Sequence, residues 1–363
     1  MKIVLIGNAD STIYIYRYEL LKRLTSDGHD VVVITPDGDL VEEMKKIGCR
    51  HYVAPVDRHG TNPVKDFLLI KRYYCILKQI KPDIVFSYTI KPNIYGAMAC
   101  RLLNIPIVVN VTGLGTAVEY KGWKQVVTLM LYRFSFKKVK TIFFQNNDNM
   151  EFFRDRKIYE EKHKLLPGSG VNLARFKLEE YPSDDVVNFI FVSRLMKEKG
   201  IDQYLEAAEY ITNKYPNTRF HICGFCEKEY ESKLEALKNN SAIIYHGMVK
   251  DMTSILPSMH CTIHPTYYPE GLSNVLLESL ATGRPIITTD RAGCREVVED
   301  GINGFVVKQQ DSRDLIEKIE KFIVLSFDEK KNMGIAGRKK VEREFDREIV
   351  VRKYLEEIED GRV

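Results

Sequence analysis

The chain has 363 residues, of which 44% are hydrophobic and 29% are charged. This composition is typical of a globular protein and excludes a disordered or fibrous chain, and the length favours two domains over one. Lys and Arg outnumber Asp and Glu by only 54 to 50, a surplus too small to indicate a nucleic-acid-binding protein.

The seven cysteines are odd in number and scattered through apolar segments, which indicates free thiols in a reducing compartment. Cys223 and Cys226 have the spacing of a metal or redox pair, but no second pair follows, so we favour core cysteines. The eight histidines show no metal-ligand spacing. The apolar run at residues 3–6 is too short for a signal peptide or a membrane span, and we expect a cytoplasmic protein without a bound metal.

Short β-branched runs alternate with longer amphipathic stretches along the whole chain, as in βαβ units that build a parallel sheet. In the first half, strands are expected at residues 3–7, 31–35, 84–87, 107–111 and 141–144. In the second half, strands are expected at residues 189–193, 219–223, 242–245, 261–264 and 285–288.

A segment dense in Gly, Pro, Ser and acidic residues, at 167–185, indicates a domain boundary. We therefore predict an N-terminal Rossmann-like domain at residues 1–168 and a C-terminal one at 169–345. The last helix, within residues 346–363, is expected to cross back to the first domain. Two such domains would face a cleft, with ligands beyond the carboxyl ends of the strands.

The strongest motif lies at residues 265–285, where a Pro- and Tyr-bearing loop follows a strand. Gly271 is expected to open a helix that Gly283 closes. The free N–H groups of the first turn, in Leu272, Ser273 and Asn274, would then suit an anion such as a diphosphate.

Glu270 and Glu278 flank this first turn. On helical spacing they would stand about 12 Å apart along the axis, which separates a sugar from a ribose. Carboxylates suit vicinal hydroxyl groups, because each oxygen accepts a hydrogen bond. Taken singly, either residue also fits an acid near a helix N-terminus or an exposed helical Glu.

A basic cluster, at residues 194–200, follows the first strand of the second half. Arg194 could grip a diphosphate through its planar fork, and Lys199 could add a point charge, which together would neutralise a nucleotide leaving group. A solvated loop at a helix start is the alternative.

Together, residues 194–200, His246-Gly247, the Glu270-x7-Glu278 spacing and residues 300–305 resemble family 4 of the retaining glycosyltransferases, over essentially the whole chain. The resemblance implies a GT-B fold, which is α/β with two facing Rossmann-like domains and a cleft between them. It also implies that Arg194 and Lys199 bind the diphosphate, that Glu278 binds the ribose, and that Glu270 binds the donor hexose.

The catalytic group implied is Glu270, Arg194 and Lys199. The other donor-binding residues implied are Glu278, Gly271, Leu272, Ser273, Asn274, Gly224, Val249, Gly7 and Asn8. On the acceptor side the resemblance implies Lys91, Thr89, Gly113 and Gly115. Many relatives carry a His after the strand expected at residues 84–87, and this His is absent here. Members of the family use a nucleotide sugar, here expected to be UDP-linked, without a metal or cofactor.

Residues 89–93 and 111–115 are similar to those of bacterial enzymes that assemble capsule, O-antigen or protein-glycan repeats on undecaprenyl diphosphate. One such enzyme adds N-acetylgalactosamine to lipid-linked bacillosamine. The expected partners are therefore a UDP-sugar, a lipid-linked saccharide and the inner face of the cell membrane, with no nucleic acid. Residues 132–140 interleave aromatic and basic side chains as an interfacial contact would, or as a buried helix with a solvated basic end would.

Three rival functions share parts of this pattern. A UDP-sugar epimerase of the same architecture would need similar phosphate contacts but no acceptor. A nicotinamide-dependent oxidoreductase is disfavoured, because the turn after Gly7 lacks the second and third glycines of the dinucleotide fingerprint. A lectin-like protein would not need the phosphate contacts.

Overall fold

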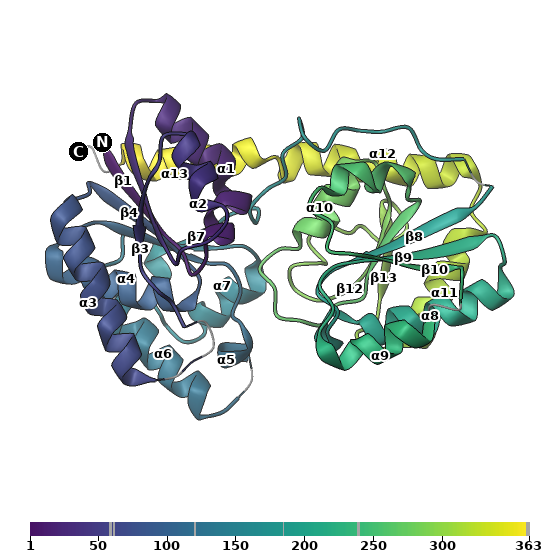
Figure 1. Cartoon of the computed structure of the whole chain (residues 1–363), viewed down its shortest axis with the longest axis horizontal. Helices are drawn as coiled ribbons and strands as arrows, with labels where there is room; N and C mark the ends of the chain where they lie inside the picture. The colour runs from purple at the N-terminus through teal and green to yellow at the C-terminus, as the bar shows by residue number, and fades with distance from the viewer. Residues whose placement is uncertain (58–59, 61, 120, 184, 238–239, 361–363) are drawn as a thin grey trace. The chain divides into compact units, whose positions relative to one another are not determined.

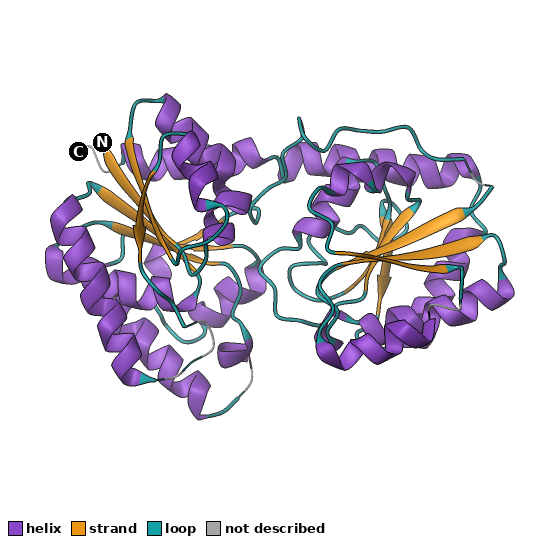
Figure 2. Cartoon of the chain, viewed as in Figure 1, coloured by secondary structure: helices purple, strands orange, loops and turns teal. Residues whose placement is uncertain are grey.

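The computed structural model describes residues 1–57, 60, 62–119, 121–183, 185–237 and 240–360, which form two compact units (Figure 1). The first unit contains Met1–Ser169, Pro269–Leu272 and Arg347–Val363, and the second contains Gly170–Tyr268 and Ser273–Asp346. Each unit is built on its own parallel sheet with helices packed against it (Figure 2), so the predicted α/β class with two Rossmann-like domains is confirmed.

The sheet of the first unit is parallel, with the strand order β3-β2-β1-β4-β5-β6-β7. The strands are β1 (Lys2–Ile6), β2 (Asp30–Thr35), β3 (Arg50–Val53), β4 (Ile84–Tyr88), β5 (Ile107–Val111), β6 (Thr141–Phe144) and β7 (His163–Leu165). The central strands are buried on both faces, which explains their continuous apolar runs. The order reverses between β1 and β4, and ligands of such sheets bind beyond the carboxyl ends at this point.

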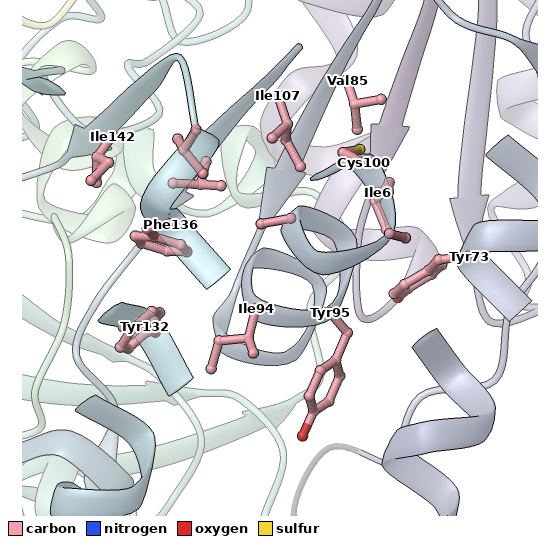
Figure 3. Packing of buried hydrophobic residues seen from close by; sticks show 14 of the residues in the cluster. Ile6, Tyr73, Val85, Ile94, Tyr95, Cys100, Ile107, Tyr132, Phe136 and Ile142 are labelled. Atoms are coloured by element: carbon pink, nitrogen blue, oxygen red, sulfur yellow. The ribbon is translucent and has the colours of Figure 1, made fainter. Parts of the chain in front are cut away.

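Helices cover both faces of this sheet. They are α1 (Asp10–Ser26), α2 (Val41–Lys46), α3 (Pro63–Ile80), α4 (Ile90–Leu103), α5 (Thr116–Glu119), α6 (Trp123–Ser135), α7 (Asn147–Arg154) and α13 (Arg347–Glu359). One core joins the sheet to α3, α4, α6 and α7, and a second joins its other face to α1, α2 and α13. Figure 3 shows part of the first core, where Ile107 and Ile142 of the strands gather with Tyr132 and Phe136.

The helix α13 is a member of the first unit through buried contacts. The Tyr354 ring packs edge-on against Phe86, with ring centroids 5.1 Å apart, and its hydroxyl bonds the side chain of Asn110. The buried carboxylate of Glu357 accepts hydrogen bonds from Thr141 Oγ1 at 2.8 Å and Lys164 Nζ at 2.6 Å. A buried carboxylate is tolerated only with such partners, so these hydrogen bonds fix the position of α13 on the sheet.

The sheet of the second unit is parallel, with the order β10-β9-β8-β11-β12-β13. Its strands are β8 (Val187–Val192), β9 (Thr218–Cys223), β10 (Ile243–Gly247), β11 (Cys261–His264), β12 (Ile286–Thr289) and β13 (Gly304–Val307). Its α-helices are α8 (Ile201–Lys214), α9 (Lys228–Leu237), α10 (Asn274–Ala281), α11 (Ser312–Ile323) and α12 (Phe327–Glu344). The order here reverses between β8 and β11.

The expected strands are all present, with ends that shift by one or two residues. The sequence missed β3, β7 and β13, which are short. Residues of β3 and β7 are partly exposed, so these two strands lack the apolar run that marks the others.

Candidate functional site

The basic loop after β8 and the loop after β11 meet at the switch point of the second sheet. β8 and β11 are neighbouring parallel strands, so their carboxyl ends lie side by side. The backbone N–H of Tyr267 donates to the carbonyl oxygen of Glu198 at 2.9 Å. A Cβ atom at Gly200 would lie 2.2 Å from the carbonyl oxygen of Pro265, so only glycine permits this approach.

Arg194 and Lys199 occupy this junction. The Arg194 guanidinium is about half exposed and stands 3.9 Å from a carboxylate oxygen of Glu227. The Lys199 ammonium lies over the ring of Tyr268, 4.9 Å from its centroid. An exposed ion pair at this distance contributes little stability, so Arg194 can turn to an anionic ligand at small cost.

Gly224 brings the loop after β9 against this cluster. Its φ is +144°, and a Cβ atom there would lie 1.7 Å from the carbonyl oxygen of Ser193, the residue before Arg194. Its N–H donates to Gly247 at the end of β10 at 2.8 Å, and Val249 follows two residues later, half buried. The loops after β8, β9, β10 and β11 are thus held together in one unit.

Helix α10 begins later than expected. It starts at Asn274 with Ser273 as its N-cap, and Gly271 lies outside it. Glu270 and Glu278 are therefore not joined by continuous helix, so the helical spacing assumed for their axial separation is not met. The chain at Gly271 approaches other backbone so closely that only glycine fits, because a Cβ atom there would lie 2.2 Å from the carbonyl oxygen of Thr112.

Two polar side chains, those of Asn274 and Glu278, lie in the first two turns of α10. Among the described residues, none supplies a hydrogen bond to the buried Oδ1 of Asn274. Glu278 is half buried in the second turn. An unsatisfied buried oxygen is costly, so Asn274 is suited to accept a hydrogen bond from a ligand.

Glu270 belongs to the first unit, in the segment Pro269–Leu272. The side-chain amide of Asn146 donates to the carbonyl oxygens of Glu270 at 3.2 Å and Gly271 at 2.5 Å. Gly113, at φ +150°, packs its Cα against the same segment, where a Cβ atom would lie 3.2 Å from the Gly271 nitrogen. Leu272 is buried, and Gly168 packs against its side chain.

Thr89, which was expected to contact the acceptor, has a strained backbone. It has φ +72°, a costly conformation for a β-branched residue, and caps α4 without a side-chain hydrogen bond. Its buried hydroxyl has no partner within the part of the chain that is described. Strain and an unsatisfied hydroxyl at the switch point of the first sheet are typical of a ligand-binding position.

The other expected residues of the first unit are placed less directly. The Lys91 ammonium is committed to the Asp66 carboxylate at 2.7 Å, in a pair that is less than a fifth exposed. Gly115, at φ +66°, packs against Ile90. Gly7 directly follows β1 and donates its N–H to the carbonyl oxygen of Ile34 at 3.0 Å, and Asn8 Oδ1 accepts from Thr12 Oγ1 at 2.9 Å.

The structure thus brings the expected residues into two sets. The second-unit set contains Arg194, Lys199, Gly224, Val249, Ser273, Asn274 and Glu278. The first-unit set gathers Gly113, Glu270, Gly271 and Leu272, with Gly7, Asn8, Thr89, Lys91 and Gly115 in loops or helix starts of the same unit. The sequence missed Asn146, although it is a polar residue just past the carboxyl end of β6, where chemistry concentrates in parallel sheets.

Burial in the second unit perturbs two groups near these loops. Cys223 is buried at the end of β9, where desolvation raises the pKa of its thiol to about 11, so it is not an activated thiolate. The ring of His221 stacks on that of His246, with Nδ1 and Nε2 2.8 Å apart. Desolvation, together with the neighbouring His246, lowers the pKa of His221 to about 4.

Arg284 is a buried residue that holds backbone segments of the second unit together. The sequence indicated it only as part of the motif that ends a helix. Its guanidinium donates to the carbonyl oxygens of Glu180 at 2.7 Å, Pro257 at 3.0 Å and Leu256 at 3.1 Å. Desolvation lowers its pKa to about 10. Arg284 therefore ties the end of α10 to two other segments of the second unit.

Two family models match the chain, one to each unit. Residues 174–340 match the model "Glycosyl transferases group 1", and residues 2–146 match "Glycosyl transferase 4-like". The chain belongs to the GT-B glycosyltransferases. Within the described residues, no helix of this glycosyltransferase is long and apolar enough to cross a membrane.

Curated relatives match this glycosyltransferase over most of its length. It is 26% identical to the N,N'-diacetylbacillosaminyl-diphospho-undecaprenol alpha-1,3-N-acetylgalactosaminyltransferase of Campylobacter jejuni, over 98% of this chain and 97% of the relative. It is 25% identical to the UDP-Gal:alpha-D-GlcNAc-diphosphoundecaprenol alpha-1,3-galactosyltransferase of Escherichia coli, over 82% and 80%. The epimerase alternative has no support from these relatives.

Solved structures share the fold. The Anabaena protein HepE in complex with UDP-glucose superposes with a TM-score of 0.83 at 16% identity, over 99% of this chain and 100% of that one. At this identity, the likeness extends to the architecture alone.

Proposed function

We propose that this glycosyltransferase transfers a hexose or N-acetylhexosamine from a UDP-sugar to a saccharide linked to undecaprenyl diphosphate, with retention at the anomeric carbon. The reaction would take place at the cytoplasmic face of the cell membrane, in the assembly of a bacterial surface polysaccharide or glycan. The names of the Campylobacter and Escherichia relatives support the acceptor class, and that of the second supports UDP as the nucleotide.

One observation carries the donor site: Arg194 and Lys199 lie in a loop fixed at the switch point of the second sheet. Negative charge develops on the β-phosphate as the bond from its oxygen to the anomeric carbon breaks. In this proposal the guanidinium and the ammonium stabilise that charge without a metal ion. The start of α10, with Asn274 Oδ1 available, adds backbone N–H groups and one acceptor.

The carboxylates take different roles in this proposal. Glu278, on α10 of the second unit, accepts hydrogen bonds from the ribose hydroxyls. Glu270, held by its backbone, accepts hydrogen bonds from the donor hexose. The acceptor oxygen attacks the anomeric carbon from the face that the diphosphate leaves and passes its proton to a diphosphate oxygen, so no enzyme nucleophile is needed.

The test is a panel of UDP-sugars offered to undecaprenyl-diphosphate-linked mono- and disaccharides, with products identified by mass spectrometry and the anomer by NMR. We expect one UDP-sugar to be transferred with retention. Conversion of UDP-N-acetylglucosamine to its 2-epimer without any acceptor would refute the transferase proposal.

Variants assign the residues. With the productive pair, Glu270→Gln should lower kcat/KM at least about 100-fold, and Arg194→Ala or Lys199→Ala should cost about 10²–10³. Lys197→Ala, in the same loop and exposed, is the matched control and should retain most activity. Full activity in all three test variants would contradict the proposed donor site.

A further inference from the structure

Helix α6 of the first unit has a large exposed apolar face. We define the α6 face as Trp123, Val126, Val127, Met130 and Phe134, which recur at the three- and four-residue spacings of one helix side. Their exposed fractions lie between 45% and 66%. The opposite side of the helix reaches the core through Tyr132, which lies beside Phe136 (Figure 3).

This arrangement bears on the two interpretations of residues 132–140, an interfacial contact or a buried helix with a solvated basic end. Tyr132 and Phe136 are buried in the core while Lys137 and Lys138 are exposed, as the second interpretation predicts. Of the aromatic residues in that segment, only Phe134 is exposed. The apolar surface instead continues toward the beginning of α6, as far as Trp123.

A second exposed apolar strip lies on the same side of the sheet. The first two turns of α3 expose Val64, Phe67 and Leu68, each by more than half. Both α3 and α6 pack against α4, in the core on that face of the sheet. Soluble proteins rarely expose several large apolar side chains together unless they form a contact.

The segment that contains the α6 face carries charge of one sign. Residues 121–140 contain six Lys or Arg and no Asp or Glu, although the whole chain carries a surplus of only four. Lys121, Lys124, Arg133, Lys137 and Lys138 are exposed. The Arg101 guanidinium lies 4.9 Å from the Phe134 ring centroid and the Lys124 ammonium 5.9 Å from that of Trp123, so positive charge borders the apolar residues directly.

We propose that the α6 face and its basic border bind the surface of an anionic lipid bilayer. An apolar helix side bordered by Lys and Arg, with Trp and Phe among the apolar residues, is suited to the boundary between headgroups and acyl chains. A second copy of the chain is disfavoured as the occupant, because two such basic surfaces would repel each other. The inference rests on the proposed function, which requires a membrane-bound acceptor, and it names the surface that meets the membrane.

The chain offers a built-in probe, because Trp123 is its single tryptophan. Phosphatidylcholine vesicles that contain phosphatidylglycerol should shift the Trp123 emission to shorter wavelength, and acyl chains brominated near the headgroup should quench it. Pure phosphatidylcholine should have a much weaker effect, and 0.5 M salt should weaken binding to the anionic vesicles. Flotation with vesicles without any change in Trp123 emission would overturn the proposal.

Substitution tests the same surface by flotation. The triple variant Val126→Ser, Met130→Ser, Phe134→Ser should bind anionic vesicles at least about ten-fold more weakly, with an unchanged circular dichroism spectrum. Ile302→Ser with Val324→Ser removes exposed apolar side chains from the second unit and should bind like the parent chain. Binding of the triple variant to vesicles as tight as that of the parent chain would overturn the proposal. A parent chain that forms a dimer, loses it in the triple variant and does not bind vesicles would also overturn it.

Activity separates this inference from the proposed function. The triple variant should lose transfer to acceptor embedded in vesicles but retain transfer to the same saccharide diphosphate on a short, water-soluble alcohol. A parent chain that binds vesicles through Trp123 but transfers to neither acceptor would refute the function and leave the surface standing. A parent chain that transfers to both acceptors without binding vesicles would refute the membrane-binding surface and leave the proposed function standing.

Discussion

Asn146 holds the backbone of Glu270 through a hydrogen bond of 3.2 Å from its side-chain amide to the Glu270 carbonyl oxygen. The same side chain caps α7, where its Oδ1 accepts from the Asn149 N–H at 2.8 Å. One residue therefore fixes the segment of the proposed sugar-binding carboxylate to the end of β6.

Asn146→Asp separates these two roles, since a carboxylate preserves the cap but cannot donate to the Glu270 carbonyl. We expect kcat to fall about 10- to 100-fold, because a loosely held carboxylate loses its orientation. We also expect a lower melting temperature, because the buried carboxylate that the variant introduces at position 146 would face the carbonyl oxygens of residues 270 and 271. Steady-state kinetics and a thermal melt measure both effects. Asn62→Ala removes a similar cap from α3 and should cost about 1 kcal/mol of stability without loss of turnover. Unchanged kcat in Asn146→Asp would show that the Glu270 segment does not need this anchor.

Gly224→Ala should be among the most disruptive single substitutions in the second unit. The added methyl group would lie 1.7 Å from the Ser193 carbonyl oxygen, at a φ of +144°. We expect a loss of more than about 3 kcal/mol in the free energy of unfolding, or displacement of the Arg194 loop with loss of donor binding.

Two glycines calibrate that experiment by denaturant titration. Gly28 has φ +78° with open space around it, so Gly28→Ala should cost only about 1–2 kcal/mol from the backbone. Gly122 also has open space but no strained φ, and Gly122→Ala should be nearly neutral. If Gly224→Ala behaved like Gly28→Ala and kept donor binding, the close approach would not matter.

Arg284→Lys should destabilise the second unit by more than about 3 kcal/mol, because an ammonium cannot satisfy three separated carbonyl oxygens. Arg219→Lys is the matched control, since Arg219 also donates to carbonyl oxygens, of Pro216 and Thr218, but near the surface. Its cost should stay below about 1 kcal/mol. Similar values for the two variants in urea unfolding would contradict the support assigned to Arg284.

The lowered pKa of His221 should make the free energy of unfolding depend on pH. Its pKa is about 4 in the folded chain against 6.5 for an ordinary histidine, so the unfolded chain binds more protons between these values. Stability must then fall as the pH drops from about 6.5 to 4, by at most about 3 kcal/mol from this residue.

The variant His221→Gln isolates that contribution, because other histidines titrate in the same range. The difference in unfolding free energy between the parent chain and the variant should shrink as the pH falls through this window. A difference that stays constant from pH 7 to pH 4 would mean that His221 titrates normally in the folded chain.

The sequence predicted the two sheets because their strands are long apolar runs between turn residues. It failed at β7, of which Leu165 is partly exposed, because three residues with little burial leave no periodic signal. The start of α10 was wrong for a different reason. The conformation at Gly271 is set by Thr112 and Asn146, and Asn146 stands 124 residues before Glu270 in the chain.

The α6 face could not be located from the sequence either. The helix carries apolar residues on most of its circumference, so its pattern does not show which side packs on the core. Only the fold distinguishes Tyr132, which is buried, from Phe134, which is exposed. The roles proposed for Arg194, Lys199, Glu270 and Glu278 remain predictions.

The seating of α13 on the first sheet has a consequence for how the protein is made. Ribosomes deliver residues 1–169 first, yet Asn110 and Thr141 receive their partners Tyr354 and Glu357 only after residues 170–346 have been synthesised. Until then, the sheet face that α13 will cover is incomplete. The first unit is therefore translated before the second but cannot complete its fold until α13 has been synthesised. While the second unit emerges, the uncovered apolar face of the first sheet is exposed to aggregation.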